Sequence, residues 1–160
     1  MGEYNNLHIY NKATEVEIGG LPILFVPWIN QNNSEETYSL IDKTKCQVVM
    51  GHLELNGFEA HKGYVMDHGN PTDPYRRFTK VFSGHFHRKS TRGNISYLGN
   101  PYQIYWNDYK DRRGFHIFDT ETLELEFIQN PYEIYQKIYY HEEHINSSMF
   151  KFHEYNNKLS

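Results

Sequence analysis

The sequence predicts an α/β fold, and three features lead to this expectation. A strand, a helix and a second strand follow one another within residues 21–50, as in a βαβ unit. Two buried strands are expected to end abruptly, each at a Gly-His pair. Aromatic residues make up 16% of the chain, including 14 Tyr and 10 Phe, which favours a packed, β-rich core.

A β-hairpin is expected near the start of the chain. Residues 6–10 and 14–18 alternate polar and apolar side chains, as half-buried strands do. Gly19-Gly20 indicates a turn, and residues 21–28 are nearly continuously apolar. We therefore expect a hairpin whose second arm is buried on both faces.

A short helix and a buried strand are expected to follow. Asn33 is a candidate N-cap with Glu35 and Glu36 in the first turn, and residues 38–41 give the helix an apolar side. Residues 46–50 then form a mostly apolar segment that stops at Gly51-His52. This segment completes the strand–helix–strand order.

Further strands are predicted in the second half of the chain. Residues 61–75 contain two Pro and two Gly and are expected to form a loop. Residues 81–83 form a buried strand that again stops at Gly-His, and residues 95–98 form another strand after a basic turn. Residues 114–119 and 123–128 form the last predicted pair.

The domain organisation is expected to be simple, since 160 residues fit one ordinary domain. We expect that domain over residues 1–130, and we expect residues 131–160 to begin a capping segment or a flexible tail. Residues 130–144 fit a helical stripe, yet their Tyr and Ile residues also favour strands.

Charge and composition narrow the classes of function. The net charge of −4 provides no overall cationic field for nucleic acid, so any DNA contact needs a local basic segment or a metal. The single cysteine, Cys46, excludes an internal disulfide framework and suits a reducing compartment. No apolar run approaches the roughly 20 residues that span a bilayer. We expect a cytoplasmic protein that does not contact a membrane.

The candidate site lies at the two Gly-His strand ends. His52 and His85 are 33 positions apart, and the carboxyl ends of strands in an open α/β sheet are where ligands bind. Gly51 and Gly84 would let the backbone turn sharply and let a ligand approach closely. Strand ends of this kind are also simply turns, and residue types and spacing leave both interpretations open.

His87 extends the same candidate site. In an extended chain its side chain would point to the same side as that of His85. If the chain turns there, the two imidazoles can serve different metals of a pair, which together stabilise the attacking and leaving oxygens of a phosphodiester. Imidazole ligands suit manganese, iron or zinc more than magnesium or calcium.

Several strings of residues resemble a known family. Residues 49–59 (Val-Met-Gly-His-Leu-Glu-Leu-Asn-Gly-Phe-Glu) and 83–87 (Ser-Gly-His-Phe-His) are similar to the last two conserved motifs of the SbcD-type nucleases, which are calcineurin-like metallophosphoesterases. Residues 95–103 and 113–120 continue the order as in the nuclease subunit of tailed-phage recombination endonucleases. The resemblance covers most of the chain.

This resemblance implies a fold, a set of ligands and partners. The implied fold is the C-terminal half of the four-layered α/β/β/α sandwich, with a mixed β-sheet and short flanking helices. His52 and His85 would bind one divalent metal and His87 a second, usually manganese. The implied function is hydrolysis of DNA phosphodiesters in recombination and repair, in the cytoplasm of a bacterial host and with an SMC-like ATPase subunit of the SbcC type.

The sequence departs from the family in its first half. The earlier motifs Asp-x-His, Gly-Asp-x-x-Asp and Gly-Asn-His-Asp, which supply the other ligands and the catalytic histidine, do not occur here. The catalytic residue is therefore unknown. Metal affinity depends on ligand number and fixed geometry, so we expect the isolated chain to be inactive. A split gene in which a separate polypeptide supplies the N-terminal half, a truncated reading frame and a deliberate fragment all stay open.

Charged residues near the histidines are candidates for accessory roles. Arg88, Lys89 and Arg92 would neutralise DNA phosphates, or they form a solvated loop. Glu54 would orient His52 from outside the ligand set, or it lies in solvent.

Aromatic residues follow the Gly-Asn-Pro string at 99–101. Tyr102, Tyr105 and Trp106 would stack on an unpaired base, as aromatic side chains do on single strands, or they belong to the core.

Three alternatives to a nuclease subunit stay open. One is an incomplete product with no independent role, whose unpaired sheet edge would be prone to aggregate. A non-catalytic interaction module would keep the half-fold and bind the ATPase or DNA, and replacing all three histidines would leave that binding unchanged. A small-molecule phosphodiesterase of the same superfamily would cleave nucleotide diesters and ignore duplex ends.

Overall fold

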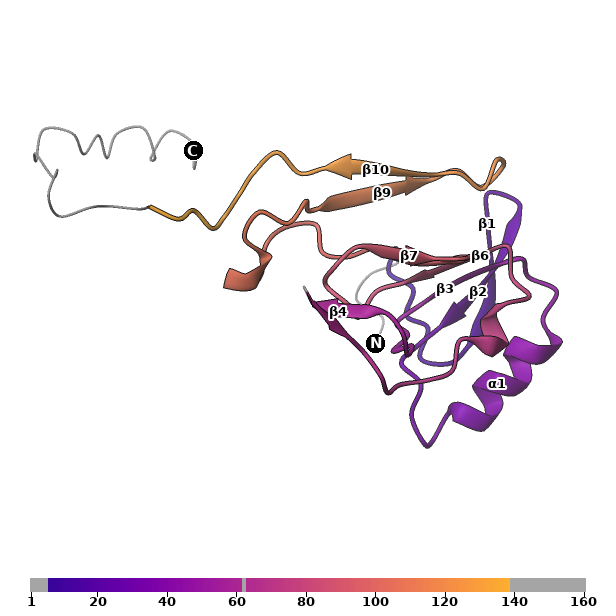
Figure 1. The fold of residues 1–160 in the computed structure, drawn as a ribbon. Helices are drawn as coiled ribbons and strands as arrows, with labels where there is room; N and C mark the ends of the chain where they lie inside the picture. Colours follow the sequence, from indigo (N-terminus) through magenta and orange to yellow (C-terminus); the bar gives the residue numbers. More distant parts are fainter. Residues whose placement is uncertain (1–5, 62, 139–160) are drawn as a thin grey trace, which may run out of the picture.

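The computed structural model describes residues 6–61 and 63–138. Over these residues the chain forms a six-stranded mixed sheet, two small two-stranded sheets and one α-helix (Figure 1). The prediction of an α/β fold with a mixed sheet and few helices is confirmed.

The central sheet has the strand order β1-β2-β3-β6-β8-β7. Neighbours from β2 to β8 pair in parallel, and the edge strands β1 and β7 pair antiparallel. Parallel pairing brings the carboxyl ends of β2, β3 and β6 to one edge of the sheet. The strands are β1 (Thr14–Ile18), β2 (Leu21–Val26), β3 (Val48–Gly51), β6 (Lys80–Ser83), β7 (Ser90–Arg92) and β8 (Ile95–Tyr97).

The predicted N-terminal hairpin is confirmed. β1 pairs with β2 with Val16 opposite Ile23, and Ile23 and Leu24 are fully buried. The predicted strand at residues 6–10 is wrong, because these residues form no strand and are exposed. An alternating pattern makes a stable strand only where a sheet neighbour pairs with it, and this segment has no such neighbour within the described residues.

Helix α1 (Ser34–Lys43) connects β2 to β3, which confirms the predicted strand–helix–strand unit. Asn33 stands at the N-cap position, but its side chain makes no hydrogen bond to the helix. Its Oδ1 accepts a hydrogen bond from the backbone N–H of Asn30 at 2.8 Å, and its Nδ2 donates to the carbonyl of Trp28 at 2.9 Å. Asn33 therefore fixes the loop between β2 and α1.

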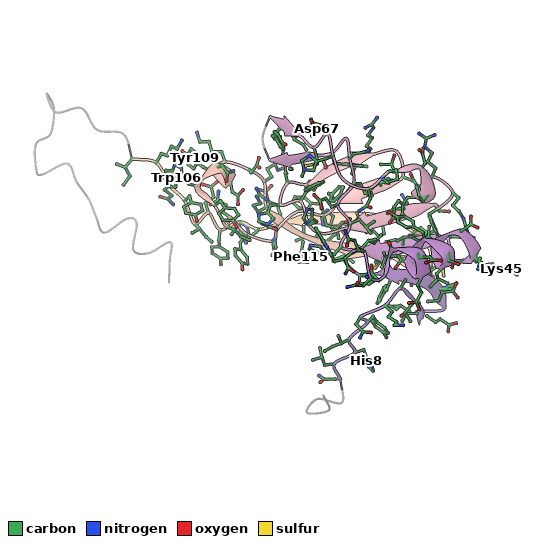
Figure 2. All side chains as sticks on the ribbon, turned by 90° about the horizontal axis from the view of Figure 1, so that it is seen from below. His8, Lys45, Asp67, Trp106, Tyr109 and Phe115 are labelled. Atoms are coloured by element: carbon green, nitrogen blue, oxygen red, sulfur yellow. The ribbon has the colours of Figure 1, made fainter. Side chains whose placement is uncertain are left out.

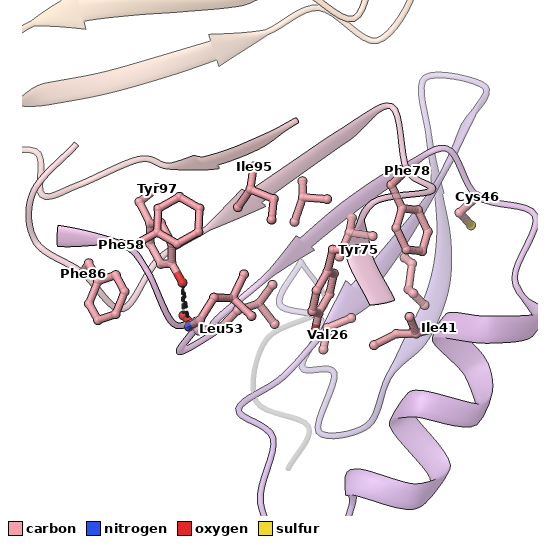
Figure 3. Close-up of a cluster of buried hydrophobic side chains, with 14 residues drawn as sticks. Val26, Ile41, Cys46, Leu53, Phe58, Tyr75, Phe78, Phe86, Ile95 and Tyr97 are labelled. Atoms are coloured by element: carbon pink, nitrogen blue, oxygen red, sulfur yellow. Dashed lines mark hydrogen bonds between the residues drawn. The ribbon is translucent and has the colours of Figure 1, made fainter. Parts of the chain in front are cut away.

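The core has two parts, one on each face of the central sheet. Successive strand residues face opposite sides, so Val49 and Val81 belong to the larger part while Val48 and Phe82 belong to the smaller. The larger part is packed against α1 (Figure 3). The smaller part is covered by strands β9 (Gly114–Phe118) and β10 (Leu125–Gln129), which lie over the other face (Figure 1).

Two predicted loops contain regular structure. The expected loop at 61–75 includes strands β4 (Glu59–His61) and β5 (Tyr64–Val65) at its start and a 3₁₀ turn, η1 (Asp73–Tyr75), at its end. The expected basic turn includes the edge strand β7. The strands β4, β5 and β7 are short, and they form because each pairs with a neighbouring strand. Local sequence patterns therefore do not predict them.

Several contacts hold the end of the described chain, and the side chain of Gln103 makes two of them. Gln103 Oε1 accepts hydrogen bonds from the backbone N–H groups of Ile134 and Tyr135, at 2.8 and 2.9 Å. Residues 131–138 form neither helix nor strand, and residues 139–160 of the predicted capping segment lie outside the described residues. The domain boundary at residue 130 stays a prediction. No helix in the described part of the chain is long and apolar enough to cross a membrane.

Arg77 closes the C-terminal end of α1. Its guanidinium donates to the carbonyls of Ile41 at 3.0 Å and Asp42 at 2.7 Å, and also to the carbonyl of Thr44. The last carbonyls of a helix have no partner within the helix, so Arg77 satisfies groups that would otherwise depend on water. The neighbouring Arg76 makes only an exposed ion pair with Asp73 at 3.0 Å.

We predict that Arg77→Ala lowers the free energy of unfolding by about 1–3 kcal/mol, the range for hydrogen bonds that involve a charged group. Arg76→Ala is the matched control and should change it by less than about 0.5 kcal/mol, because exposed ion pairs contribute little. Urea unfolding followed by circular dichroism measures both. Equal losses in the two variants would contradict the capping role of Arg77.

Candidate functional site

The carboxyl ends of three neighbouring strands bring three rings together. His52 follows β3 and His85 comes two residues after β6, and their ring centroids lie 5.3 Å apart. Trp28 comes two residues after β2, and its ring lies 5.7 Å from that of His52 and 4.9 Å from that of His85. The two Gly-His strand ends therefore meet in space, as the sequence predicted. Trp28 was not singled out from the sequence.

The two glycines permit close approach at this edge. A Cβ on Gly51 would lie 2.7 Å from the carbonyl oxygen of Val26, which accepts a hydrogen bond from the backbone N–H of His52 at 3.1 Å. A Cβ on Gly84 would lie 3.3 Å from Nδ1 of His52. The sharp backbone turn was expected at Gly51 and Gly84. In the segment 83–87 it occurs instead at His85, whose φ is positive at 72°.

The backbone conformation of His85 gives its side chain and that of His87 different surroundings. A positive φ is uncommon for a residue with a Cβ, and such strain concentrates at functional sites. Beyond this turn the ring of His87 stacks on Tyr105, with centroids 5.4 Å apart and planes 6° from parallel. The imidazole of His85 instead lies against the imidazole of His52 and the indole of Trp28. The two side chains thus have different neighbours.

Two buried hydroxyls hold the segment that follows His52. The backbone N–H of Leu53 donates to Ser83 Oγ at 2.8 Å. Tyr97 Oη donates to the carbonyl of Leu53 at 2.9 Å and accepts from the N–H of Leu55 at 3.0 Å (Figure 3). No local pattern indicates either role, because the hydrogen-bond partners are at least 30 residues apart in the chain.

Burial and nearby charges act on His85. Loss of solvation lowers the pKa of His85, the carboxylate of Glu54 raises it, and His52 and His87 lower it further. A lowered pKa favours the neutral imidazole, which is the form that binds metals. Glu54 therefore influences His85 electrostatically, while no hydrogen bond joins its carboxylate to His52 within the described part of the chain.

The three basic candidates for DNA contact point to different places. Arg88 forms an ion pair with Glu59 at 2.9 Å, with both side chains about 30% exposed. The Lys89 ammonium lies 3.5 Å from the ring centroid of Phe127, on β10. Arg92 donates to the carbonyl of Gly57 at 3.4 Å. Of the three, only Arg88 lines the cavity beside the histidines.

A cavity of about 220 Å³ lies beside His85 and His87. Its other wall comes from the loop that follows the Gly-Asn-Pro string, including Tyr105, Asp111 and Arg113. No group of three or more His, Cys, Asp or Glu side chains that could hold a metal occurs among residues 6–61 and 63–138.

The sequence is similar to one known nuclease subunit. It is 37% identical over 140 residues to exonuclease subunit 1 of Enterobacteria phage T4. The match covers 88% of this chain and 41% of that protein, so the chain spans about two fifths of the length of this relative. No family model matches the chain.

We predict that Tyr97→Phe lowers the free energy of unfolding by about 1–3 kcal/mol, because it leaves the N–H of Leu55 buried without its partner and removes the shorter of the two hydrogen bonds to the carbonyl of Leu53. Tyr75→Phe is the matched control. Tyr75 is equally buried, but its hydroxyl has no hydrogen-bond partner, so its removal should be neutral or stabilising. Chemical unfolding measures both, and a larger loss for Tyr75→Phe would contradict the role of Tyr97.

Proposed function

We propose that this chain forms part of the metal site of a DNA nuclease subunit of the calcineurin-like metallophosphoesterase kind. The observation that carries the proposal is the contact between His52 and His85, at the carboxyl edge of a parallel sheet where ligands bind. Similarity to an exonuclease subunit supports the same class of reaction. A central sheet with α1 on one face and β9–β10 on the other is compatible with part of an α/β/β/α sandwich.

The donor chemistry at the strand ends fits part of a two-metal site. His52 and His85 would hold one divalent metal, with Gly84 leaving room beside His52. His87 would hold the second, with its ring orientation supported by the stacked Tyr105. Two manganese ions would supply charge stabilisation for the attacking and leaving oxygens of a phosphodiester. Ser83 and Tyr97 hold the backbone after His52, and so limit its movement.

The proposed site needs ligands beyond those three histidines. We propose that a separate polypeptide, corresponding to an N-terminal half, supplies them together with the catalytic residue. The assembled subunit would act on DNA in the cytoplasm of a bacterial host with an SMC-like ATPase of the SbcC type. Of the three basic candidates, Arg88 would act near the scissile phosphate, because it is the one of them that lines the histidine cavity.

A non-catalytic interaction module is the second candidate. The outer face of β9 exposes two large apolar side chains, Phe115 at 55% and Ile117 at 53%. Exposed apolar patches on a sheet often mark a contact with another polypeptide. This face is compatible with either role, since a nuclease subunit also needs to bind its partners.

We predict weak manganese binding by this chain alone and tight binding of two ions when it is co-expressed with a candidate N-terminal half from the same genome neighbourhood. His52→Ala and His85→Ala should each weaken binding by more than about 100-fold, since residues that merely support metal ligands already cost 10–100-fold. His68→Ala is the control, because His68 is exposed and pairs with Asp67. Calorimetry measures the affinities.

The same mixture tests the reaction. Manganese-dependent degradation of duplex DNA ends supports the nuclease, and no degradation overturns it. Cleavage of nucleotide diesters without attack on DNA would indicate the small-molecule phosphodiesterase. Partner binding that persists after replacement of all three histidines, in a mixture that binds no manganese, would indicate the interaction module.

A further inference from the structure

We propose that an aromatic face beside the histidine cavity binds unpaired bases of single-stranded nucleic acid. This aromatic face consists of Tyr105, Trp106, Tyr109 and Lys137. The inference deepens the proposed function and rests on it for the nature of the ligand. It adds a binding site that holds the strand by stacking, separate from the residues proposed to hold metals.

Two rings of the aromatic face, those of Tyr105 and Trp106, are exposed, and Tyr109 is half-buried beside Trp106. Tyr105 is 57% and Trp106 53% exposed, and the rings of Trp106 and Tyr109 lie 6.2 Å apart and 13° from parallel. Trp106 begins the 3₁₀ turn η2 (Trp106–Asp108). Figure 2 shows Trp106 and Tyr109 at the opposite end of the molecule from Lys45, which follows α1. Grouped exposed aromatic rings are typical of binding surfaces.

Lysine ammonium groups lie over the rings of the aromatic face. The Lys137 ammonium lies 4.7 Å from the ring centroid of Tyr109 and 5.8 Å from that of Trp106. The Lys110 ammonium lies 5.3 Å from the ring centroid of Tyr109. Because the net charge of the chain is −4, these local cations provide attraction for phosphates that the molecule as a whole lacks. Rings interleaved with cations favour a strand of nucleic acid over an apolar protein segment.

Tyr105 joins the aromatic face to the histidines. Its ring is stacked on His87, and both side chains line the cavity of about 220 Å³. This volume is below the roughly 300–1,000 Å³ of typical ligand pockets, so it suits a single base or sugar. A strand that stacks on Trp106 and Tyr105 would therefore bring its end to His85 and His87.

A buried ion-pair network holds the loop under Tyr105. Arg113, whose side chain is 5% exposed, donates to Asp108 Oδ1 at 2.6 Å, to Asp111 Oδ2 at 3.2 Å and to the carbonyl of His87. Asp108 Oδ2 in turn accepts from the backbone N–H of Tyr105 at 3.1 Å. The ring is thus tied to the histidine segment before a ligand binds, which reduces the entropic cost of binding.

Arg113 also offers a free hydrogen-bond donor. Its Nε is buried and has no hydrogen-bond partner among residues 6–61 and 63–138, and Arg113 lines the cavity. Buried donors without a partner are rare and point to a missing ligand or water. A base or sugar oxygen in the cavity is a suitable acceptor for this N–H group.

The test is fluorescence anisotropy with a labelled oligodeoxythymidine of about 15 nucleotides, a length within the reach of a stacking site. Measurements in EDTA keep the result independent of metals. Tyr105→Ala and Trp106→Ala should each weaken binding by about 5- to 140-fold, which corresponds to 1–3 kcal/mol per stacked base. Ile18→Ala is the control, because Ile18 is 43% exposed at the end of β1 and should leave the affinity unchanged.

A second measurement needs no substitution in the aromatic face. The chain has two tryptophans, Trp28 and Trp106, so Trp28→Phe leaves Trp106 as the single reporter. Oligodeoxythymidine should quench the fluorescence of this variant if a base stacks on Trp106. No quenching at saturating oligonucleotide, or no binding by the unaltered chain at low salt, overturns the proposal.

The outcomes separate this inference from the proposed function. If the Tyr105 and Trp106 variants lose oligonucleotide binding while the assembled mixture never cleaves DNA, the nuclease proposal fails and the aromatic face stands. If the mixture cleaves DNA but both variants bind oligonucleotide like the unaltered chain, the aromatic face is not a nucleic-acid site. If they bind oligonucleotide normally but no longer associate with a partner subunit, the face is a protein interface and the inference is wrong.

Discussion

The candidate site depends on the close parallel approach of β2, β3 and β6 at their carboxyl ends. Gly51 makes this approach possible, because any side chain there would collide with the carbonyl of Val26. The hydrogen bond from His52 N–H to that carbonyl then continues the pairing beyond the last residue of β3. Because the ends of β3 and β6 lie close together, the rings of His52 and His85 lie 5.3 Å apart. A bulkier residue at position 51 would separate the strands and the two imidazoles with them.

The polar groups around this edge are satisfied from within the fold. Buried backbone groups need partners, and the segment after His52 leaves the sheet, so it cannot use the strand ladder. The hydroxyls of Ser83 and Tyr97 replace that ladder for Leu53 and Leu55. The same two residues therefore contribute to stability and to the position of His52, which links folding directly to the proposed chemistry.

The strained turn at His85 divides the histidine region into two parts. His85 packs with His52 and Trp28, whereas His87 packs with Tyr105. Both parts hold histidines proposed to bind a metal, and the His87 part also leads through the cavity to the aromatic face. Such an arrangement would let one short segment, residues 84–87, contact both a metal and the end of a strand that the metal acts on.

The sequence by itself determined the hairpin, the helix and the order of the buried strands, because hydrophobic periodicity and turn residues are local properties. It also indicated a candidate site at the two Gly-His strand ends, since the carboxyl ends of strands in an open α/β sheet are where ligands bind. Only the tertiary structure decided the turn at His85, the separate directions of Arg88, Lys89 and Arg92, and the support from Tyr97. Each of these depends on contacts between residues far apart in the chain, and local patterns do not encode such contacts.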